Sequence, residues 1–190
     1  MDDMAADKTT MRRLYRKRRD EFVAALSLQD HGIAFSQAPS PLSAYFQPPS
    51  IVAGYIAKDS EANPSALLVA SYDRGCVTAL PYITSRSAPM QFLRWSPGDH
   101  LEPGPFGLMQ PNADAEVVAP DVILVPLVAF DNRLMRLGQG AGHYDRALSL
   151  LGQSIAIGIG WSVQHAPAVE VDQWDIPMDA ILTEKSWMTL

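Results

Sequence analysis

The spacing of apolar residues near the start of the chain predicts an amphipathic helix over residues 8–26. One face carries apolar residues at three- and four-residue steps: Met11, Leu14, Tyr15, Phe22, Ala25 and Leu26. The opposite stripe carries the cations Lys8, Arg12, Arg16 and Arg19. Two interpretations of this stripe stay open. It is either a solvated face whose long side chains cover neighbouring apolar surface, or a binding face for a polyanion.

Beyond this helix, short apolar runs alternate with helical patterns. Helices are predicted within residues 29–46, over 64–72 and over 142–151, whereas the Pro- and Gly-rich residues 97–107 predict a loop. Strands are predicted over residues 51–57, 76–83, 90–95, 122–125, 154–161 and 180–183. This alternation predicts an α/β layered fold with a mostly parallel central sheet flanked by helices, whose ligands bind beyond the carboxyl ends of the strands.

Length and composition favour one intracellular domain over residues 1–190. The chain is 47% apolar, enough for one complete core. The single cysteine, Cys76, excludes an internal disulfide and a multi-cysteine zinc site, and we expect it to be a buried strand residue. No signal peptide or membrane span is recognisable, so we expect a cytoplasmic protein with no membrane partner. We also expect a monomer. The order of residues 1–7 is left open.

The charge distribution bears on possible partners. The formal net charge is −6, yet seven of the fifteen Lys and Arg residues lie between Lys8 and Arg19. An acidic protein with one cationic segment is poorly suited to nucleic acid, so we expect no nucleic-acid partner. The same segment suits a polyphosphate or another anionic small molecule.

Residues 136–146, Arg-Leu-Gly-Gln-Gly-Ala-Gly-His-Tyr-Asp-Arg, place three alternating glycines before a helix. Glycine lets a ligand approach the backbone closely, and a helix N-terminus offers free N–H groups to an anion. The spacing is neither the Walker pattern nor the dinucleotide fingerprint, so a phosphate cradle and a ligand-free turn both stay open. Asp145 is either an ordinary first-turn acid or a magnesium ligand. A second ligand could come from Asp172, Asp175 or Asp179.

Residues 125–131, Val-Pro-Leu-Val-Ala-Phe-Asp, followed by residues 136–146 resemble the signature of the 5-formyltetrahydrofolate cyclo-ligase family, also called methenyltetrahydrofolate synthetase. The resemblance covers nearly the whole chain. Further matches occur in the family's order: Lys8-x-x-x-Arg12, Glu61 after Gly54-Tyr-Ile, Trp95 with Pro97-Gly98, Phe106-Gly107 before Pro111, and Asp175-x-x-x-Asp179-Ala-Ile-Leu-Thr-Glu184.

The resemblance implies a site for ATP, Mg²⁺ and 5-formyltetrahydrofolate. Lys8 and Arg12 would contact the ATP phosphates, and Lys8 and Arg136 would be the catalytic residues. Asp145 and Asp175 would hold Mg²⁺. The nucleotide loop would consist of Arg136, Leu137, Gly138, Gln139, Gly140, Ala141, Gly142, His143 and Tyr144. The folate would contact Ile56, Glu61, Gln139, Gly140 and His143.

The reaction that the resemblance implies is phosphoryl transfer from ATP to the formyl oxygen. The neighbouring nitrogen then attacks the activated carbon, giving 5,10-methenyltetrahydrofolate, ADP and phosphate. Such chemistry depends on positioning and charge neutralisation more than on a protein nucleophile. We expect Asp145→Asn and Arg136→Ala to lower turnover with little loss of fold, because both residues would lie on a ligand surface.

Four residues depart from the family pattern: Ala141 stands at a position that is often Gly, Gln110 at a place often held by Glu, and His143 and Gln139 differ as well. His143 stands where Tyr or Phe is common, and Gln139 stands where Tyr or Arg is frequent. These departures motivate an alternative hypothesis, a non-catalytic relative that binds nucleotide or folate.

Overall fold

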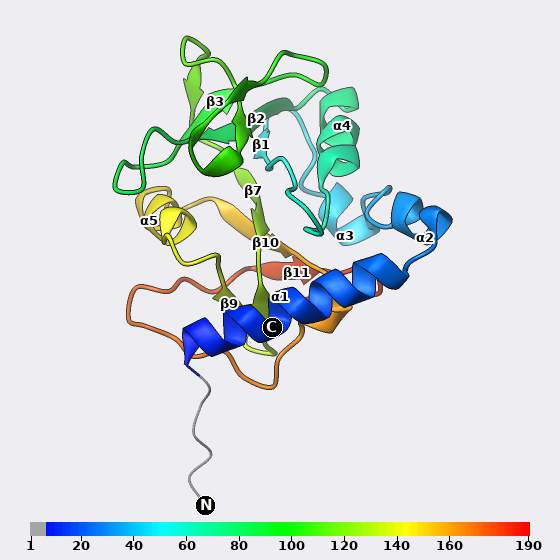
Figure 1. Ribbon diagram of the computed structural model, residues 1–190. Helices are drawn as coiled ribbons and strands as arrows, with labels where there is room; N and C mark the ends of the chain where they lie inside the picture. Colours follow the sequence, from blue (N-terminus) through cyan, green and yellow to red (C-terminus); the bar gives the residue numbers. More distant parts are fainter. Residues whose placement is uncertain (1–6) are drawn as a thin grey trace, which may run out of the picture.

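A computed structural model describes residues 7–190, which form a twisted sheet flanked by helices (Figure 1). The eight strands follow the order β12-β11-β10-β7-β1-β2-β3-β6. Neighbouring strands in the centre are parallel: β11 (Ala180–Leu182), β10 (Ile155–Ile159), β7 (Val122–Pro126), β1 (Ile51–Ala53) and β2 (Val77–Tyr82). The strands at the edges are antiparallel: β12 (Trp187–Met188), β3 (Gln91–Arg94) and β6 (Val117–Val118). The predicted α/β class with a mostly parallel sheet is confirmed.

Helices cover both faces of this sheet, and two small hairpins lie beside it. The helices are α1 (Lys8–Ala25), α2 (Leu28–Ile33), α3 (Ser40–Ser43), α4 (Ser65–Asp73) and α5 (His143–Leu150), with 3₁₀ turns η1 (Pro105–Gly107) and η2 (Ser162–Gln164). The hairpins pair β4 (Glu102–Pro103) with β5 (Met109–Gln110) and β8 (Ala129–Phe130) with β9 (Arg136–Leu137). Asp7 caps α1 by accepting hydrogen bonds from the backbone N–H groups of Thr9 and Thr10. The other residues of the segment 1–7 lie outside the described part.

Alternate residues of the central strands point to opposite faces, and both faces are buried. On β7, Val122 and Leu124 join the core beneath α3 and α4, whereas Ile123 and Val125 join the core beneath α5. A parallel sheet needs such double coverage, which explains why its strands are nearly continuous apolar runs. Helix α1 packs through Met11 on the β8–β9 hairpin and through its later turns against the first core.

The order of the parallel strands fixes where a ligand can bind. Counted along the chain, the parallel strands β2, β1, β7, β10 and β11 are strands 2-1-3-4-5. The chain therefore runs from β1 to β2 on one side and later crosses to β7 on the other side of β1. In doubly wound sheets the crevice at this switch point, beyond the carboxyl ends of the strands, is the usual ligand site. The residues that follow β1, and the glycine loop that follows β9, both lie at this crevice.

Several sequence predictions need correction. The predicted strand 51–57 ends at Ala53, and the next residue, Gly54, packs so closely on α4 that a Cβ would lie 2.6 Å from Leu68 Cδ1. Residues 97–107 are not all loop, since β4 and η1 begin there. Leu14, placed on the apolar face of α1, is 42% exposed. Among the described residues, no helix combines the length and apolarity that crossing a membrane requires.

Candidate functional site

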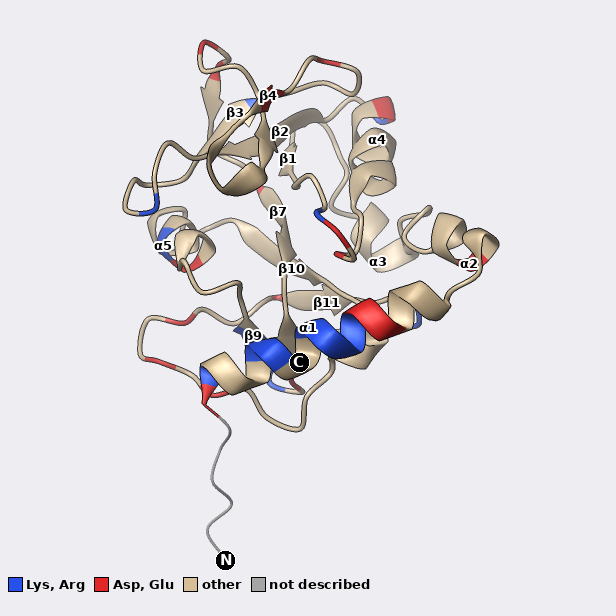
Figure 2. Cartoon of the chain, viewed as in Figure 1, with Lys and Arg blue, Asp and Glu red and all other residues tan. Residues whose placement is uncertain are grey.

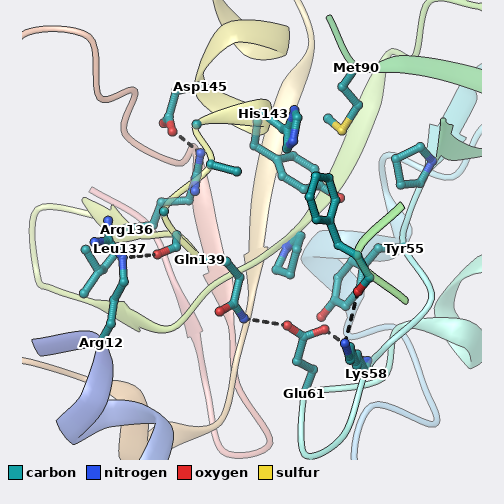
Figure 3. A pocket seen from close by; sticks show the side chains of 18 of the residues that line it. Arg12, Tyr55, Lys58, Glu61, Met90, Arg136, Leu137, Gln139, His143 and Asp145 are labelled. Carbon is teal, nitrogen blue, oxygen red and sulfur yellow. Dashed lines mark hydrogen bonds and ion pairs between the residues drawn. The ribbon is translucent and has the colours of Figure 1, made fainter. Parts of the chain in front are cut away.

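A cavity of about 1510 Å³ opens beyond the carboxyl ends of β1, β2 and β7 (Figure 3). Its walls are the inner face of α1, the segment after β1, the glycine loop with the start of α5, and residues 172–176. Pockets for one small molecule usually measure roughly 300–1,000 Å³. This cavity therefore has room for more than one ligand.

The glycine loop presents its backbone to the cavity. Gly140 and Gly142 have φ values of +108° and +66°, which side-chain-bearing residues rarely adopt. At Gly138 a Cβ would lie 2.7 Å from Nη1 of Arg136, so this glycine is needed for space. Gly142 is the N-cap of α5 and brings no side-chain cap to the first helical turn. The loop thus combines close backbone access with a helix N-terminus, which are the features that favour an anion.

Arg136 lies in the cavity wall with its side chain only 3% exposed. Its Nη2 donates to Asp145 Oδ1 over 2.7 Å, and its guanidinium carbon lies 5.8 Å from the centre of the Tyr144 ring. Within residues 7–190, neither Arg136 Nε nor the Tyr144 hydroxyl has a hydrogen-bond partner. Buried donors without partners are rare in folded proteins, so both atoms point to a ligand that would satisfy them.

The burial of Arg136 corrects one expectation from the sequence. We expected this residue on a ligand surface, where its removal would cost little stability. Because the side chain is buried and ion-paired, its truncation would leave Asp145 without its cation and cost stability as well as turnover.

The cationic stripe of α1 lines the cavity. Figure 2 shows that Lys and Arg positions of the chain gather along α1. Arg12 Nε donates to the carbonyl of Gly138 over 2.9 Å, and Arg16 Nη2 donates to the carbonyl of Gln139 over 3.2 Å. Arg19 is buried and donates to Ser60 Oγ over 2.9 Å. The interpretation of this stripe as a solvated face is therefore wrong.

Crowding of positive charge on α1 has an electrostatic consequence. Burial, together with the charges of Arg19 and Arg12, lowers the pKa of Arg16 from its usual value. Like charges held together in a cavity repel one another, and a bound anion relieves that repulsion. This inner face of α1 is thus suited to a polyanion.

Lys8 holds the loop of residues 172–176 against α1. Its Nζ donates to Asp172 Oδ2 over 2.7 Å and also to Asp175. Burial alone would lower the pKa of Lys8, but hydrogen bonds and charge from these two carboxylates outweigh burial and raise it. Lys8 therefore remains a cation throughout the neutral range.

The two sequence-predicted metal ligands, Asp145 and Asp175, both line the cavity. Each is paired with a cation, Asp145 with Arg136 and Asp175 with Lys8. Asp179 instead accepts the backbone N–H of Ala156 over 2.7 Å and does not line the cavity. No cluster of three or more His, Cys, Asp or Glu ligands occurs in the described residues. Mg²⁺ needs only one or two carboxylates when phosphates complete its shell, so the residues present fit such an ion.

The predicted folate residues occupy the other side of the glycine loop. Glu61 accepts hydrogen bonds from Gln139 Nε2 over 2.7 Å and from the backbone N–H of Lys58 over 3.1 Å. Ile56 lines the same wall. The remaining predicted loop residues, Leu137, Gly140 and Ala141, also line the cavity. The structure thus brings every residue predicted for the site to one cavity.

His143 is a buried part of this wall. Its Nδ1 lies 3.1 Å from Arg146 Nη2, and its ring centre lies 6.3 Å from that of Phe106. Burial and the charges of Arg146 and Arg86 lower the pKa of His143. Since arginine only donates, Nδ1 accepts this hydrogen bond and the imidazole proton resides on Nε2, which has no partner in the described residues.

Sequence reasoning missed Tyr55, Lys58 and Phe106, which also line the cavity. The buried Tyr55 hydroxyl donates to the carbonyl of Ala62, and Lys58 Nζ donates to the carbonyl of Phe106 over 3.1 Å. The polar run that begins at Lys58, directly after the strand predicted over residues 51–57, was a usable signal. For Phe106 the one signal was the family match of Phe106-Gly107, which gave it no role; the residue lies in the 3₁₀ turn η1 with φ +63°.

Comparison with known proteins shows the family to which the chain belongs. Residues 4–184 match the sequence pattern of the 5-formyltetrahydrofolate cyclo-ligase family. The chain belongs to this family. It is accordingly an enzyme of the cyclo-ligase class.

Individual relatives agree with this family membership. The Escherichia coli 5-formyltetrahydrofolate cyclo-ligase is 32% identical over 144 residues, covering 72% of this chain and 79% of the relative. The Haemophilus influenzae enzyme of the same name is 30% identical over 138 residues, covering 69% and 74%. A solved 5,10-methenyltetrahydrofolate synthetase from Aquifex aeolicus superposes with a TM-score of 0.75 at 27% identity, covering 96% of this chain and 92% of that one.

Proposed function

We propose that this protein converts 5-formyltetrahydrofolate to 5,10-methenyltetrahydrofolate, with ATP consumed to ADP and phosphate. The observation that carries the proposal is the shape and lining of the cavity beyond β1, β2 and β7. One side offers glycine backbone, α1 cations and the Arg136 Nε, which has no partner among residues 7–190. The other side offers the apolar surfaces of Tyr55, Ile56 and Phe106 beside the Glu61 carboxylate. These two sides suit a polyphosphate and a flat, N–H-bearing pteridine.

On the nucleotide side, Arg12 and the backbone of residues 137–144 would hold the phosphates. Arg136 Nε would donate to a phosphate oxygen while Nη2 keeps its bond to Asp145. Asp145 and Asp175 would hold Mg²⁺, which, when bound, neutralises negative charge on the phosphates. Their present partners are the cations Arg136 and Lys8, which lie 2.7 Å from Asp145 Oδ1 and 2.5 Å from Asp175 Oδ2.

On the folate side, Glu61 would accept N–H groups of the pterin ring, and Ile56 would cover an apolar part of it. The Gln139–Gly140 backbone and His143 would lie between the two ligands. His143 Nε2 carries the imidazole proton, so it would donate to an acceptor on the bound ligand.

The proposed reaction transfers the terminal phosphoryl group of ATP to the formyl oxygen. The neighbouring nitrogen of the folate then attacks the formyl carbon and loses its proton. The bond between that carbon and the phosphorylated oxygen breaks, which releases phosphate. Charge builds on non-bridging phosphate oxygens, so fixed cations and backbone N–H groups accelerate the step by stabilising that charge. Arg136, fixed by Asp145 and Tyr144, and Lys8, fixed by two aspartates, are such cations.

The proposal is tested by mixing the protein with 5-formyltetrahydrofolate, ATP and Mg²⁺ and following near-ultraviolet absorbance of the methenyl product. We expect a rise that requires ATP and stops when Mg²⁺ is chelated. Folded protein that binds both ligands by calorimetry without any rise would overturn the proposal and favour the non-catalytic alternative.

A further inference from the structure

Gln139 connects three parts of the site that are far apart in the sequence. It lies on the glycine loop between two glycines, and its side chain reaches both α1 and the segment after β1 (Figure 3). Its Oε1 accepts from Arg16 Nη2 over 2.6 Å and from Arg16 Nε over 3.1 Å. Its Nε2 donates to Glu61 Oε1 over 2.7 Å.

The chemistry of the neighbours fixes the orientation of this amide. Arginine has donors only, and a carboxylate has acceptors only, so a flipped amide would lose its contacts with both Arg16 and Glu61. Glu61, whose side chain is 13% exposed, receives its other hydrogen bond from the backbone of Lys58, and Arg19 Nη1 lies 3.9 Å from Oε1. Gln139 is thus the side-chain hydrogen-bond donor that sets where the Glu61 carboxylate points.

The same residue is tied to the nucleotide side through its backbone. The carbonyl of Gln139 accepts from Arg16, and the carbonyl of the preceding residue, Gly138, accepts from Arg12. A phosphate that draws these arginines or shifts the loop would move the Gln139 side chain as well. Glu61 would then change position with it.

We propose that Gln139 is a positioning residue that couples occupancy of the glycine loop to the affinity of Glu61 for the folate. This inference rests on the proposed function for the identity of the two ligands. It requires that nucleotide and folate affinities depend on each other by the same factor, because coupling between two binding sites is reciprocal. Removing the amide would uncouple them while leaving each ligand's other contacts in place.

The test is titration calorimetry of 5-formyltetrahydrofolate, with and without a non-hydrolysable ATP analogue and Mg²⁺. We expect the analogue to tighten folate binding to the wild-type protein about tenfold, within the usual range for coupled sites. In Gln139→Ala that factor should fall to about one or two, with analogue affinity within about threefold of wild type. Gln139 is exposed, so the variant should fold. Gln153→Ala, at an exposed glutamine outside the cavity, is the matched control and should keep the wild-type factor.

A second variant distinguishes a positioning role of Gln139 from a general effect of substitution on the fold. Gln139→Glu keeps acceptors for Arg16 but places a carboxylate against Glu61, so folate affinity should fall below that of Gln139→Ala at equal thermal stability. Wild-type coupling in Gln139→Ala, or wild-type folate affinity in Gln139→Glu, would overturn the inference. Absence of methenyl product with wild-type protein would instead overturn the proposed reaction, since the binding measurements do not depend on turnover.

Discussion

Gly138→Ala is expected to separate activity from stability. The added Cβ would lie 2.7 Å from Arg136 Nη1, about 0.7 Å inside the 3.4 Å at which ordinary contact begins. The guanidinium cannot easily yield, because it is buried, bonded to Asp145 over 2.7 Å and stacked near Tyr144. A displacement approaching 1 Å at a catalytic group costs on the order of 100-fold in rate. We therefore expect kcat/KM to fall by about that factor.

The expected stability change is small because two effects oppose each other. Crowding Arg136 costs about 1–2 kcal/mol. The φ of Gly138 lies outside the left-handed region, so alanine fits the backbone and gains about 0.4–1 kcal/mol by restricting the unfolded chain. The free energy of unfolding should fall by roughly 0–1.6 kcal/mol, the difference between these two ranges.

The assay pairs steady-state formation of the methenyl product with denaturant unfolding. Gly152→Ala is the matched control, because a Cβ there meets nothing within 4 Å and its φ is also outside the left-handed region. That control should keep full activity. A Gly138→Ala protein with kcat/KM within threefold of wild type would refute the reasoning that a fixed Arg136 position is required.

Two further substitutions test the wall of the cavity and its support. Asp145→Asn should lower kcat/KM at least about 100-fold and raise the Mg²⁺ concentration needed for half-maximal rate. It should also lower the free energy of unfolding by about 1–2 kcal/mol, because Arg136 loses a charged partner. An unchanged dependence of the rate on Mg²⁺ would show that Asp145 is not a metal ligand. Asp131, 1% exposed, accepts bonds from Val169, Arg133 and Met135, and although burial alone would raise its pKa, these bonds lower it. The stability that the ionised Asp131 carboxylate contributes is complete above the ordinary pKa of 3.8 and is lost as pH falls through the depressed native pKa. Asp131→Asn should therefore lower the free energy of unfolding by about 2–3 kcal/mol near pH 7 and by less at pH 2. An equal loss at both pH values, measured by denaturant unfolding, would contradict this.

The sequence predicted the parts of the fold that depend on local pattern. The helix over 8–26 is observed as Lys8–Ala25, and the strand over 122–125 as Val122–Pro126, because long periodic or apolar runs leave few alternatives. Two-residue strands such as β8 and β9 are too short to show any period. Their pairing depends on Asp131, whose bonds to the turn and to Val169 are tertiary contacts.

The sequence was enough to predict which residues line the site, but not which of them contact one another. Every predicted residue lines the cavity, yet the pairs Lys8 with Asp175 and Arg16 with Gln139 join residues more than a hundred positions apart. The burial of Arg19 could not be predicted from the sequence for the same reason. A polar stripe on a helix, taken alone, suggests a solvent-exposed face. Here the stripe faces a cavity whose walls carry its hydrogen-bond partners, such as Ser60 for Arg19.

The central claim is that phosphoryl transfer drives cyclisation of 5-formyltetrahydrofolate in this cavity. The most direct measurement is the ratio of products formed by wild-type protein in one sample, with methenyl product followed by absorbance and nucleotides by chromatography. The account predicts one ADP and one phosphate for each 5,10-methenyltetrahydrofolate formed. Methenyl product without ADP, or ATP cleaved to AMP and pyrophosphate, would contradict it.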